Sequence, residues 1–386
     1  MVNLKNILSI GNTFYMGNKE KVLKLFGLKI KLKFFNPSYY LEYLNLFKFL
    51  HHNVKPNTAY IIEFNSGHFE TILGYYKYLK DLGFNVEILM NKRGFTGFDS
   101  KIKENIKVWR FGVEFLVKIF DKYSFNKESY LVFNSKRVYD NLEEGTDLSE
   151  IIKYPKEKSV FVQHHIDKVF ETPEDKQIIL ANPAKDDKLE NIVVNPHYFG
   201  DVKITDKNDI TNFIMVGTLD EKRRNGNLII SATKTLVENG FKNFKITVVG
   251  NGNLNNIEDK YSKFIDIKGG IDYKEMYEEM EKSDFFLPLL DPDVKAQDRY
   301  KKSGTSGSFQ LIYGFLKPCI IHKTFADIYN FTEKDSLIYE ENQQLANSMQ
   351  KAIEMTKEEY KNYQNNLKNA VENLEQTSLE NFKNLL

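Results

Sequence analysis

The chain has 386 residues, of which 41% are hydrophobic and 28% charged, and its formal net charge at pH 7 is +1. This length suggests two domains, and the composition excludes a disordered chain. The near-neutral charge argues against nucleic acid as a partner, and no apolar run approaches the roughly 18 residues of a membrane-spanning helix. The single cysteine, Cys319, rules out an internal disulfide framework, and residues 1–8 lack the apolar core of a signal peptide. We therefore expect a cytoplasmic protein.

Residues 1–57 read as a basic, aromatic leader. Lysines alternate with apolar residues over 22–35, which predicts a β-hairpin with its turn near Gly27, and the aromatic-rich stretch 39–50 predicts a buried helix. Between residues 19 and 33 of this leader, six lysines stand against one acid, Glu20: Lys19, Lys21, Lys24, Lys29, Lys31 and Lys33. Two interpretations stay open, a solvated structure or peripheral contact with an anionic membrane surface.

From residue 58 the chain alternates between apolar strands and helices, as α/β folds do. We predict strands at 59–64, 86–90, 130–133, 159–162, 178–183 and 191–196, and a helix at 69–82. The first two strands and the helix form a βαβ unit, whose helix opens after a turn of small polar residues. The last two strands end in Asn-Pro turns.

A second alternation begins near residue 212. Its predicted strands are 213–216, 244–249, 264–267, 285–289, 319–321 and 337–339, and its predicted helices are 227–239, 273–282 and 309–316. The sequence thus predicts an α/β protein with two doubly wound, Rossmann-like domains that face a central cleft. We place a first domain at 1–205, a second domain at 206–355, and helices that pack back on the first domain at 356–386.

Ligands of open α/β sheets bind beyond the carboxyl ends of the strands, so loops that follow strands are the candidate sites. The segment 303–308 is rich in Gly, Ser and Thr and opens a helix, where free N–H groups and the helix dipole favour a phosphate. The residues singled out there are Ser303, Gly304, Thr305 and Ser306. The alternative is an ordinary capped helix.

Two glycine turns follow strands of the second half. After Gly217 and Thr218 come three consecutive cations, of which Lys222 and Arg223 are our candidates for neutralising a diphosphate, although a solvated turn is the alternative. Gly250-Asn251-Gly252 invites a dinucleotide interpretation, but Asn255 stands where a third glycine is needed, so a tight turn that lines the cleft is favoured.

Histidines follow two strands of the first half. His164 and His165 come directly after strand 159–162, and His68 ends the turn 65–68. Each could supply a general base or a hydrogen bond to a sugar, with a structural role as the alternative, and no partner at metal-ligand spacing accompanies them. Glu70, one turn into the helix, is interpreted as structural.

These segments together resemble the GT-B glycosyltransferases, and the second half is similar to the family-4-like sugar-nucleotide transferases. The segments that carry the likeness are 213–219 with Lys222 and Arg223, 248–252, 270–272 and 314–320, which resemble the family's Gly-Arg-Leu turn with its Lys, its Val-Gly-x-Gly turn, the turn beside the nucleotide base, and its Gly-x-Pro-Val segment. Ser66 and Gly67 resemble the glycine loop near the acceptor, and His164-His165 falls where the family carries a cleft histidine. Two features depart from the pattern: the paired glutamates would fall near Ser303 and Leu311, where none stands, and Thr218 replaces the arginine.

The resemblance implies a metal-independent glycosyltransferase without a cofactor, which moves a sugar from a nucleotide-sugar donor, UDP-linked, to a glycan or lipid-linked acceptor. It implies polysaccharide biosynthesis at the inner face of the membrane. Donor-binding residues would be Gly217, Thr218, Lys222, Arg223, Gly250, Asn251, Ile271, Ser303, Gly304, Thr305 and Ser306; acceptor-side residues Ser66 and Gly67; and catalytic residues His68, His164 and His165. A nucleotide-sugar epimerase of the same fold and a non-catalytic sugar-binding protein are the alternatives.

Overall fold

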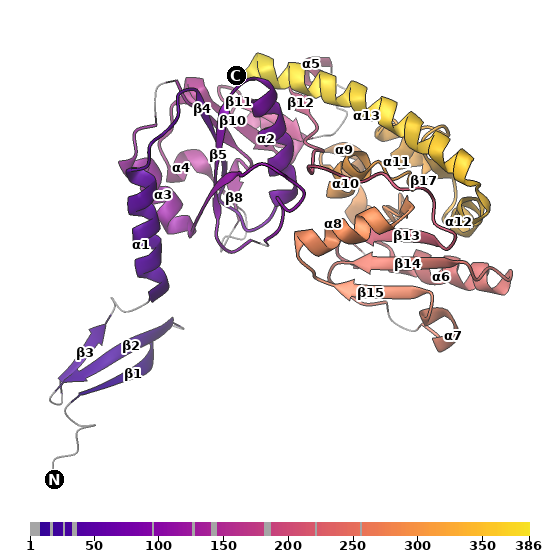
Figure 1. Cartoon of the computed structure of the whole chain (residues 1–386), viewed down its shortest axis with the longest axis horizontal. Coiled ribbons are helices and arrows are strands. Elements are labelled where there is room, and N and C mark those ends of the chain that lie inside the picture. The colour runs from indigo at the N-terminus through magenta and orange to yellow at the C-terminus, as the bar shows by residue number, and fades with distance from the viewer. Residues whose placement is uncertain are drawn as a thin grey trace, which may run out of the picture.

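The structure, a computed structural model, describes residues 8–15, 18–25, 28–32, 37–94, 96–125, 128–139, 145–180, 187–220, 222–254 and 257–386 (Figure 1). Two parallel sheets with covering helices make up most of it, and a small antiparallel sheet stands apart at the N-terminal end.

The leader forms an antiparallel sheet followed by a helix. Strands β1 (Leu8–Tyr15), β2 (Asn18–Leu25) and β3 (Leu28–Leu32) pair in chain order, which confirms the predicted hairpin, while its turn at Gly27 lies outside the described residues. Helix α1 (Pro37–Leu50) follows. The prediction of a buried helix is wrong for one face, because Leu46 and Phe49 are buried against the protein but three large apolar side chains opposite them are exposed.

The larger sheet has seven parallel strands in the order β12-β11-β10-β7-β4-β5-β6. Their bounds are β4 (Thr58–Glu63), β5 (Asn85–Asn91), β6 (Lys107–Phe111), β7 (Tyr130–Phe133), β10 (Ser159–Gln163), β11 (Lys176–Leu180) and β12 (Val193–Val194). Its helical elements are η2 (Phe69–Thr71), α2 (Ile72–Asp81), α3 (Val113–Lys122) and η4 (Ile166–Glu171). We call α1 to β12 the N-terminal lobe. The sequence missed β6 and α3, and the predicted Asn182-Pro183 turn lies outside the described residues.

The second sheet runs β15-β14-β13-β16, also parallel. Its strands are β13 (Thr211–Val216), β14 (Phe244–Val249), β15 (Ile265–Gly269) and β16 (Phe285–Phe286), and a bridge between Phe286 and Cys319 joins the pair β17 (Ile320–His322) and β18 (Leu337–Tyr339) to β16. Its main helices are α6 (Gly226–Glu238), α8 (Tyr273–Lys282), α10 (Gly307–Phe315), α11 (Lys323–Ile328) and α12 (Leu345–Glu354). We call β13 to α12 the C-terminal lobe.

Short elements complete the described chain: β8 (Arg137–Val138), β9 (Thr146–Asp147), α4 (Leu148–Ile151), η3 (Lys156–Lys158), α5 (Asp187–Glu190), α7 (Asp259–Ser262), η5 (Lys295–Gln297), α9 (Arg299–Lys302) and η6 (Asn342–Gln344). In each lobe the strand order reverses at the first strand of the sheet. This strand is β4 in the N-terminal lobe, between β5 and β7, and β13 in the C-terminal lobe, between β14 and β16. Both lobes are therefore doubly wound, as predicted, and the ends of β4, β7, β13 and β16 are where a ligand is expected.

Helix α13 (Lys357–Leu385) runs along both lobes (Figure 1). Near its start Tyr360 packs edge-on against Phe285 of β16, and near its end Phe382 lies against Tyr75 and Tyr78 of α2. Asn381 donates to the backbone carbonyl of Val193, 2.9 Å away. The helix thus ties the lobes together, while domain boundaries at 205 and 355 stay a prediction.

Candidate functional site

A cavity of about 630 Å³ lies between the lobes, where the loops after β4, β7 and β10 face those after β13 and β16. Its described walls consist of His68, Glu70, Ser135, Tyr139, His164 and His165 from the N-terminal lobe, and of Val216, Gly217, Thr218, Arg223, Arg224, Tyr273, Met276, Arg299, Tyr300, Gly304, Thr305, Ser306, Gly307, Ser308 and Leu311 from the C-terminal lobe. The cavity is therefore at the carboxyl ends of the strands of both sheets, where such folds bind ligands.

Arg224 is the buried cation of this cavity. Its Nη2 donates to the hydroxyls of Ser306 and Ser308, each 2.8 Å away, and its Nη1 donates to the carbonyl of Arg223 at 2.7 Å. Only 6% of the residue is exposed, and its Nε has no hydrogen-bond partner. Burial lowers the pKa of the guanidinium, while Tyr300 opposes that shift. No carboxylate of the described residues pairs with Arg224, so a buried positive charge stands without a protein anion.

The turn before α6 explains why this arginine points inward. The carboxylate of Asp220 accepts from the backbone N–H groups of Lys222 and Arg223, at 2.8 and 2.7 Å, which closes a tight turn. The N–H of Arg224 then bonds to the Asp220 carbonyl at 2.8 Å. Lys222 and Arg223 are exposed on this turn, and Arg224 alone of the three cations is buried.

The start of α10 faces the same space. Ser306 is its N-cap, and its hydroxyl accepts from the Ser308 N–H at 3.3 Å. A Cβ on Gly304 would meet nothing closer than 3.6 Å, and one on Gly307 would meet only Glu70 Oε1 at 3.7 Å. The predicted loop therefore opens into free space at the positive end of a nine-residue helix, beside Arg224.

The glycine turns after β13 and β14 hold each other in place. Gly217 and Gly250 have φ values of 133° and 135°, and a Cβ on Gly250 would lie 2.1 Å from the Gly217 carbonyl oxygen. The N–H of Leu219 donates to the Asn251 carbonyl at 2.8 Å. The close approach of the two backbones requires a glycine at 250, and the positive φ favours one at 217. Gly250 and Asn251 do not line the cavity.

On the opposite wall, the rings of His68 and His164 lie 4.2 Å apart, centre to centre. His164 Nε2 is 3.0 Å from the Asn134 carbonyl, which can only accept, so Nε2 carries the proton and Nδ1 the lone pair. Burial, with His68 nearby, lowers the pKa of His164 to about 3, so this histidine is neutral at physiological pH.

His68 has a left-handed backbone, with a φ of 63°. Its carbonyl accepts from the hydroxyl of Thr71 at 2.7 Å and from the side-chain amide of Asn134 at 2.9 Å, which hold this conformation. Its side chain is 46% exposed because it opens onto the cavity. Burial opposes its charge, but Glu70 and then Glu63 outweigh that effect and raise its pKa.

A buried carboxylate supports this wall from behind. Glu63, fully buried, accepts from the backbone N–H of Asn65 at 2.7 Å and from Asn134 Nδ2 and Ser135 Oγ, each at 2.8 Å. Burial raises its pKa, against the effect of these bonds and of His68. The hydroxyl of Ser135 also lies 3.3 Å from His164 Nε2. The loops after β4 and β7 are thus locked to one another.

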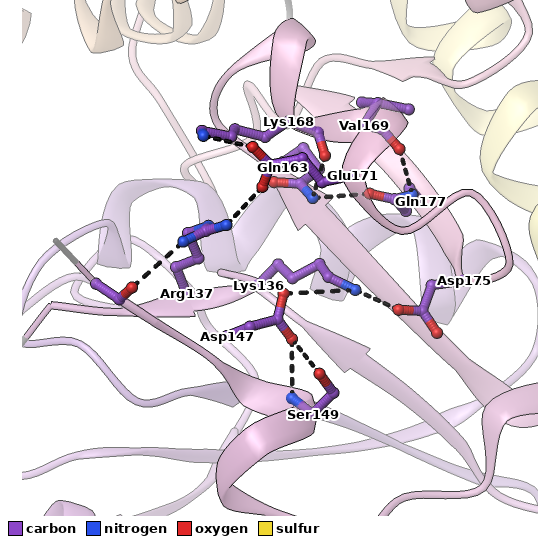
Figure 2. A network of polar contacts seen from close by, with 11 residues as sticks. Lys136, Arg137, Asp147, Ser149, Gln163, Lys168, Val169, Glu171, Asp175 and Gln177 are labelled. Carbon is purple, nitrogen blue, oxygen red and sulfur yellow. Dashed lines mark hydrogen bonds and ion pairs between the residues drawn. The ribbon is translucent and has the colours of Figure 1, made fainter.

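Lys136, next to Ser135, anchors the loop after β7 from inside the protein (Figure 2). Its buried ammonium pairs with the buried carboxylate of Asp175 and lies 3.8 Å from Asp147. Asp147 in turn accepts from the N–H and hydroxyl of Ser149, at 2.9 and 2.6 Å. This ion pair fixes the loop without touching the cavity, so we assign it a structural role.

Three contacts between described residues join the lobes at the cavity wall. The phenol of Tyr273 on α8 donates to Glu70 Oε2 at 2.9 Å. His165 forms an isolated antiparallel bridge with Gly304, and the N–H of Ile166 donates to the Ser303 carbonyl at 2.8 Å. Burial lowers the pKa of His165. Residues distant in sequence therefore meet around one space.

The structure brings most of the predicted site residues together. Those in the cavity wall are His68, His164, His165, Gly217, Thr218, Arg223, Gly304, Thr305 and Ser306, and those outside it are Ser66, Gly67, Lys222, Gly250, Asn251, Ile271 and Ser303. The sequence missed Arg224, Glu70 and Tyr300. Arg224 belonged to the recognised run of three cations, but nothing local distinguishes it from its neighbours.

The described part of the chain lacks two features. No group of three or more His, Cys, Asp or Glu side chains there could hold a metal ion. None of the helices described is long and apolar enough to cross a bilayer.

Comparison with solved structures identifies the fold. No protein-family model and no curated protein sequence matches the chain. Among solved structures, a glycosyltransferase from Rickettsia africae aligns with a TM-score of 0.53 and 14% identity over 86% of this chain and 97% of that one. WaaG, a glycosyltransferase involved in lipopolysaccharide biosynthesis, aligns with a TM-score of 0.51 and 11% identity over 84% of this chain and 98% of its own. At these identities the likeness shows the fold.

Proposed function

We propose, starting from the GT-B fold that this chain has, that it is a glycosyltransferase that takes its sugar from a UDP-linked donor. The observation that carries the proposal is Arg224, a buried guanidinium beside the start of α10, whose Nε has no partner and which pairs with no carboxylate of the described residues. A buried charge is retained where a ligand neutralises it, and a diphosphate is the anion that a nucleotide-sugar transferase releases.

The leaving diphosphate would lie between Arg224 and the first N–H groups of α10. Arg223, exposed at the cavity edge, supplies a second positive charge, and the hydroxyls of Thr305 and Ser306 supply hydrogen bonds. Two guanidinium groups and a helix N-terminus can neutralise the charge that develops on the leaving oxygen, so the proposed reaction needs no metal ion. Gly217 and Thr218 line the same side.

The acceptor would enter from the side of the N-terminal lobe, where His68, Ser135 and His164 form the wall. We propose a glycan or lipid-linked acceptor of polysaccharide biosynthesis, reached from a membrane surface at its cytoplasmic face. Helix α1 supports this, because Leu41, Leu44 and Phe47, at three-residue spacing, are 61%, 57% and 61% exposed. The six lysines between residues 19 and 33 would attract anionic lipid.

Release of UDP tests the activity. A panel of UDP-sugars is offered with and without candidate acceptor glycans, and free UDP and interconverted sugar nucleotides are both measured. A transferase releases UDP faster when its acceptor is present, whereas an epimerase converts the sugar without such release. If UDP neither raises the melting temperature nor appears as a product with any donor, the proposed function is wrong.

Sedimentation with vesicles tests the membrane contact. The protein should pellet with vesicles that contain phosphatidylglycerol, and Leu44→Asp with Phe47→Asp should abolish this, since two charges would replace the exposed apolar side chains that enter the bilayer. Ile210→Asp is the matched control, because Ile210 is 57% exposed but lies beside β13, away from α1. Equal binding by all three proteins would contradict the contact.

A further inference from the structure

A tyrosine phenol lies among the positive charges of the cavity. Tyr300, on α9, lines the cavity together with Arg224 and Arg299, and only 5% of the residue is exposed. Its oxygen accepts a hydrogen bond from Arg299 Nη2 at 2.5 Å, and the same guanidinium lies over the Tyr300 ring, 4.6 Å from the ring centre. Arg299 itself is exposed, so the cation that holds the phenol is free to turn towards a ligand.

The hydrogen of this phenol has no acceptor among the described residues. A guanidinium carries only donors, so Arg299 uses a lone pair of the phenol oxygen and cannot take the phenol hydrogen. No other described side chain or carbonyl accepts it. Buried donors are normally satisfied, and because the phenol lines the cavity, a ligand there can supply the missing acceptor.

The surroundings of the phenol favour negative charge. Burial opposes its ionisation, but the charge of Arg224 and then the hydrogen bond and charge of Arg299 outweigh burial and lower the pKa of Tyr300. The effect is mutual, because Tyr300 opposes the lowering of the Arg224 pKa by burial. The two arginines therefore attract either an ionised phenol or the anion of a ligand to the same place.

We propose that the Tyr300 phenol donates its hydrogen to the diphosphate of the donor, and that UDP binds only while the phenol keeps this proton. The inference rests on the proposed glycosyltransferase function, because it takes the diphosphate to lie beside Arg224. The protonated phenol is a donor for a phosphate oxygen, whereas the ionised phenol neutralises both arginines and repels the ligand. Once the empty site has lost this proton, each UDP that binds takes up one proton from the solvent.

The other charged or titratable side chains near the phenol keep their charge state above neutral pH. Among the described residues these are Arg223, His165 and Tyr329. An arginine stays charged throughout this range. Burial lowers the pKa of His165, so its ring is neutral, and burial raises the pKa of Tyr329, whose hydroxyl donates to the Tyr300 carbonyl at 3.0 Å. Of this set, Tyr300 is the group that should titrate between neutral pH and about pH 10.

The first test is the pH dependence of UDP affinity. At neutral pH, Tyr300→Phe should bind UDP about ten- to a hundredfold more weakly than wild type, because a hydrogen bond to a charged group is lost. Above the pKa of Tyr300 in the empty site, the wild-type affinity should fall about tenfold for each pH unit, and the two affinities should draw together. Uracil also loses a proton at alkaline pH, and the comparison of the two proteins cancels this effect. A ratio of affinities that does not change with pH overturns the inference.

Two further variants sharpen this test. Tyr139→Phe is the matched control, because Tyr139 lines the opposite wall of the cavity and is 48% exposed, and it should leave the wild-type pH dependence unchanged. Arg299→Gln keeps the Tyr300 phenol but removes one of the two cations that favour its ionisation, so the fall in affinity should begin at a higher pH. This variant also tests the coupling if Tyr300→Phe does not fold. A fall that begins at the wild-type pH in Arg299→Gln contradicts the proposal.

The second test counts the protons. Calorimetric titration with UDP in two buffers of different ionisation enthalpy gives the number of protons taken up on binding. Above the pKa of Tyr300, wild type should take up as much as one proton more for each UDP than Tyr300→Phe, and equal uptake would refute the coupling. The two proposals fail separately: UDP binding without this linkage removes the present inference alone, whereas no UDP binding at any pH removes both.

Discussion

Replacing Arg224 by methionine isolates the charge on which the proposed function rests. Methionine fills a similar volume but cannot bond to Ser306 or Ser308. A buried charge without an oppositely charged partner does not stabilise the folded state, so its loss should change the free energy of unfolding little. Ser306 keeps its helix-capping bond to the Ser308 N–H. We expect the ligand-free variant to melt close to the wild-type temperature.

The Arg224→Met variant should bind UDP much more weakly than the wild-type protein. Hydrogen bonds to a charged group contribute about 1.5–3 kcal/mol, so the dissociation constant should rise roughly ten- to a hundredfold. At a UDP concentration of 100 times the wild-type Kd, ligand binding stabilises the wild-type protein by about 2.7 kcal/mol. A hundredfold weaker variant gains only about 0.4 kcal/mol at the same concentration. A tenfold weaker variant gains about 1.4 kcal/mol, so the shift in melting temperature on adding UDP should fall to about half of the wild-type shift or less.

Calorimetric titration with UDP and thermal melting with and without it measure both quantities on the same protein. Lys222→Met is the matched control, because Lys222 stands two residues away, is exposed and does not line the cavity. It should bind UDP within about twofold of wild type, since solvent and salt screen an exposed charge. If Arg224→Met keeps full UDP affinity but loses stability, or if Lys222→Met weakens binding equally, Arg224 is not the diphosphate contact.

Three further predictions concern the surroundings of the cavity. Gly250→Ala would place a Cβ 2.1 Å from the Gly217 carbonyl oxygen and should lower the melting temperature. Gly304→Ala, whose Cβ would have no neighbour closer than 3.6 Å, should leave it unchanged. Equal melting temperatures of the two variants would contradict the packing argument. Lys136→Met leaves the carboxylate of Asp175 buried without its cation, so the free energy of unfolding measured in urea should fall by about 3–5 kcal/mol. The double variant Lys136→Met with Asp175→Leu should recover most of this loss. Burial lowers the pKa of His164 from 6.5 to about 3, so its contribution to stability is complete above pH 6.5 and is lost as the pH falls towards 3; His164→Gln should flatten the melting profile across that range, and an unchanged profile would refute it.

The sequence alone predicted the sheets because buried parallel strands leave a local signature. Strands such as 59–64 and 244–249 are nearly continuous apolar runs, bounded by turns of small polar residues. The loop 303–308 was found in the same way, from Gly, Ser and Thr at a helix start. Strand β6 was missed because, at the edge of its sheet, it mixes exposed and buried positions and carries Lys107 and Arg110.

Only the tertiary structure decided which of these residues form the site. The run Lys222-Arg223-Arg224 is chemically uniform in sequence, and burial of Arg224 depends on the Asp220 turn and on two serines more than 80 positions along the chain. The sequence places Glu70 on a helix with no sign of a partner, because that partner, the Tyr273 phenol, is 203 positions away. Apolar periodicity is a property of neighbouring residues, whereas a buried charge acquires its role from the solvent it loses and the groups that face it, which are set by how the lobes pack.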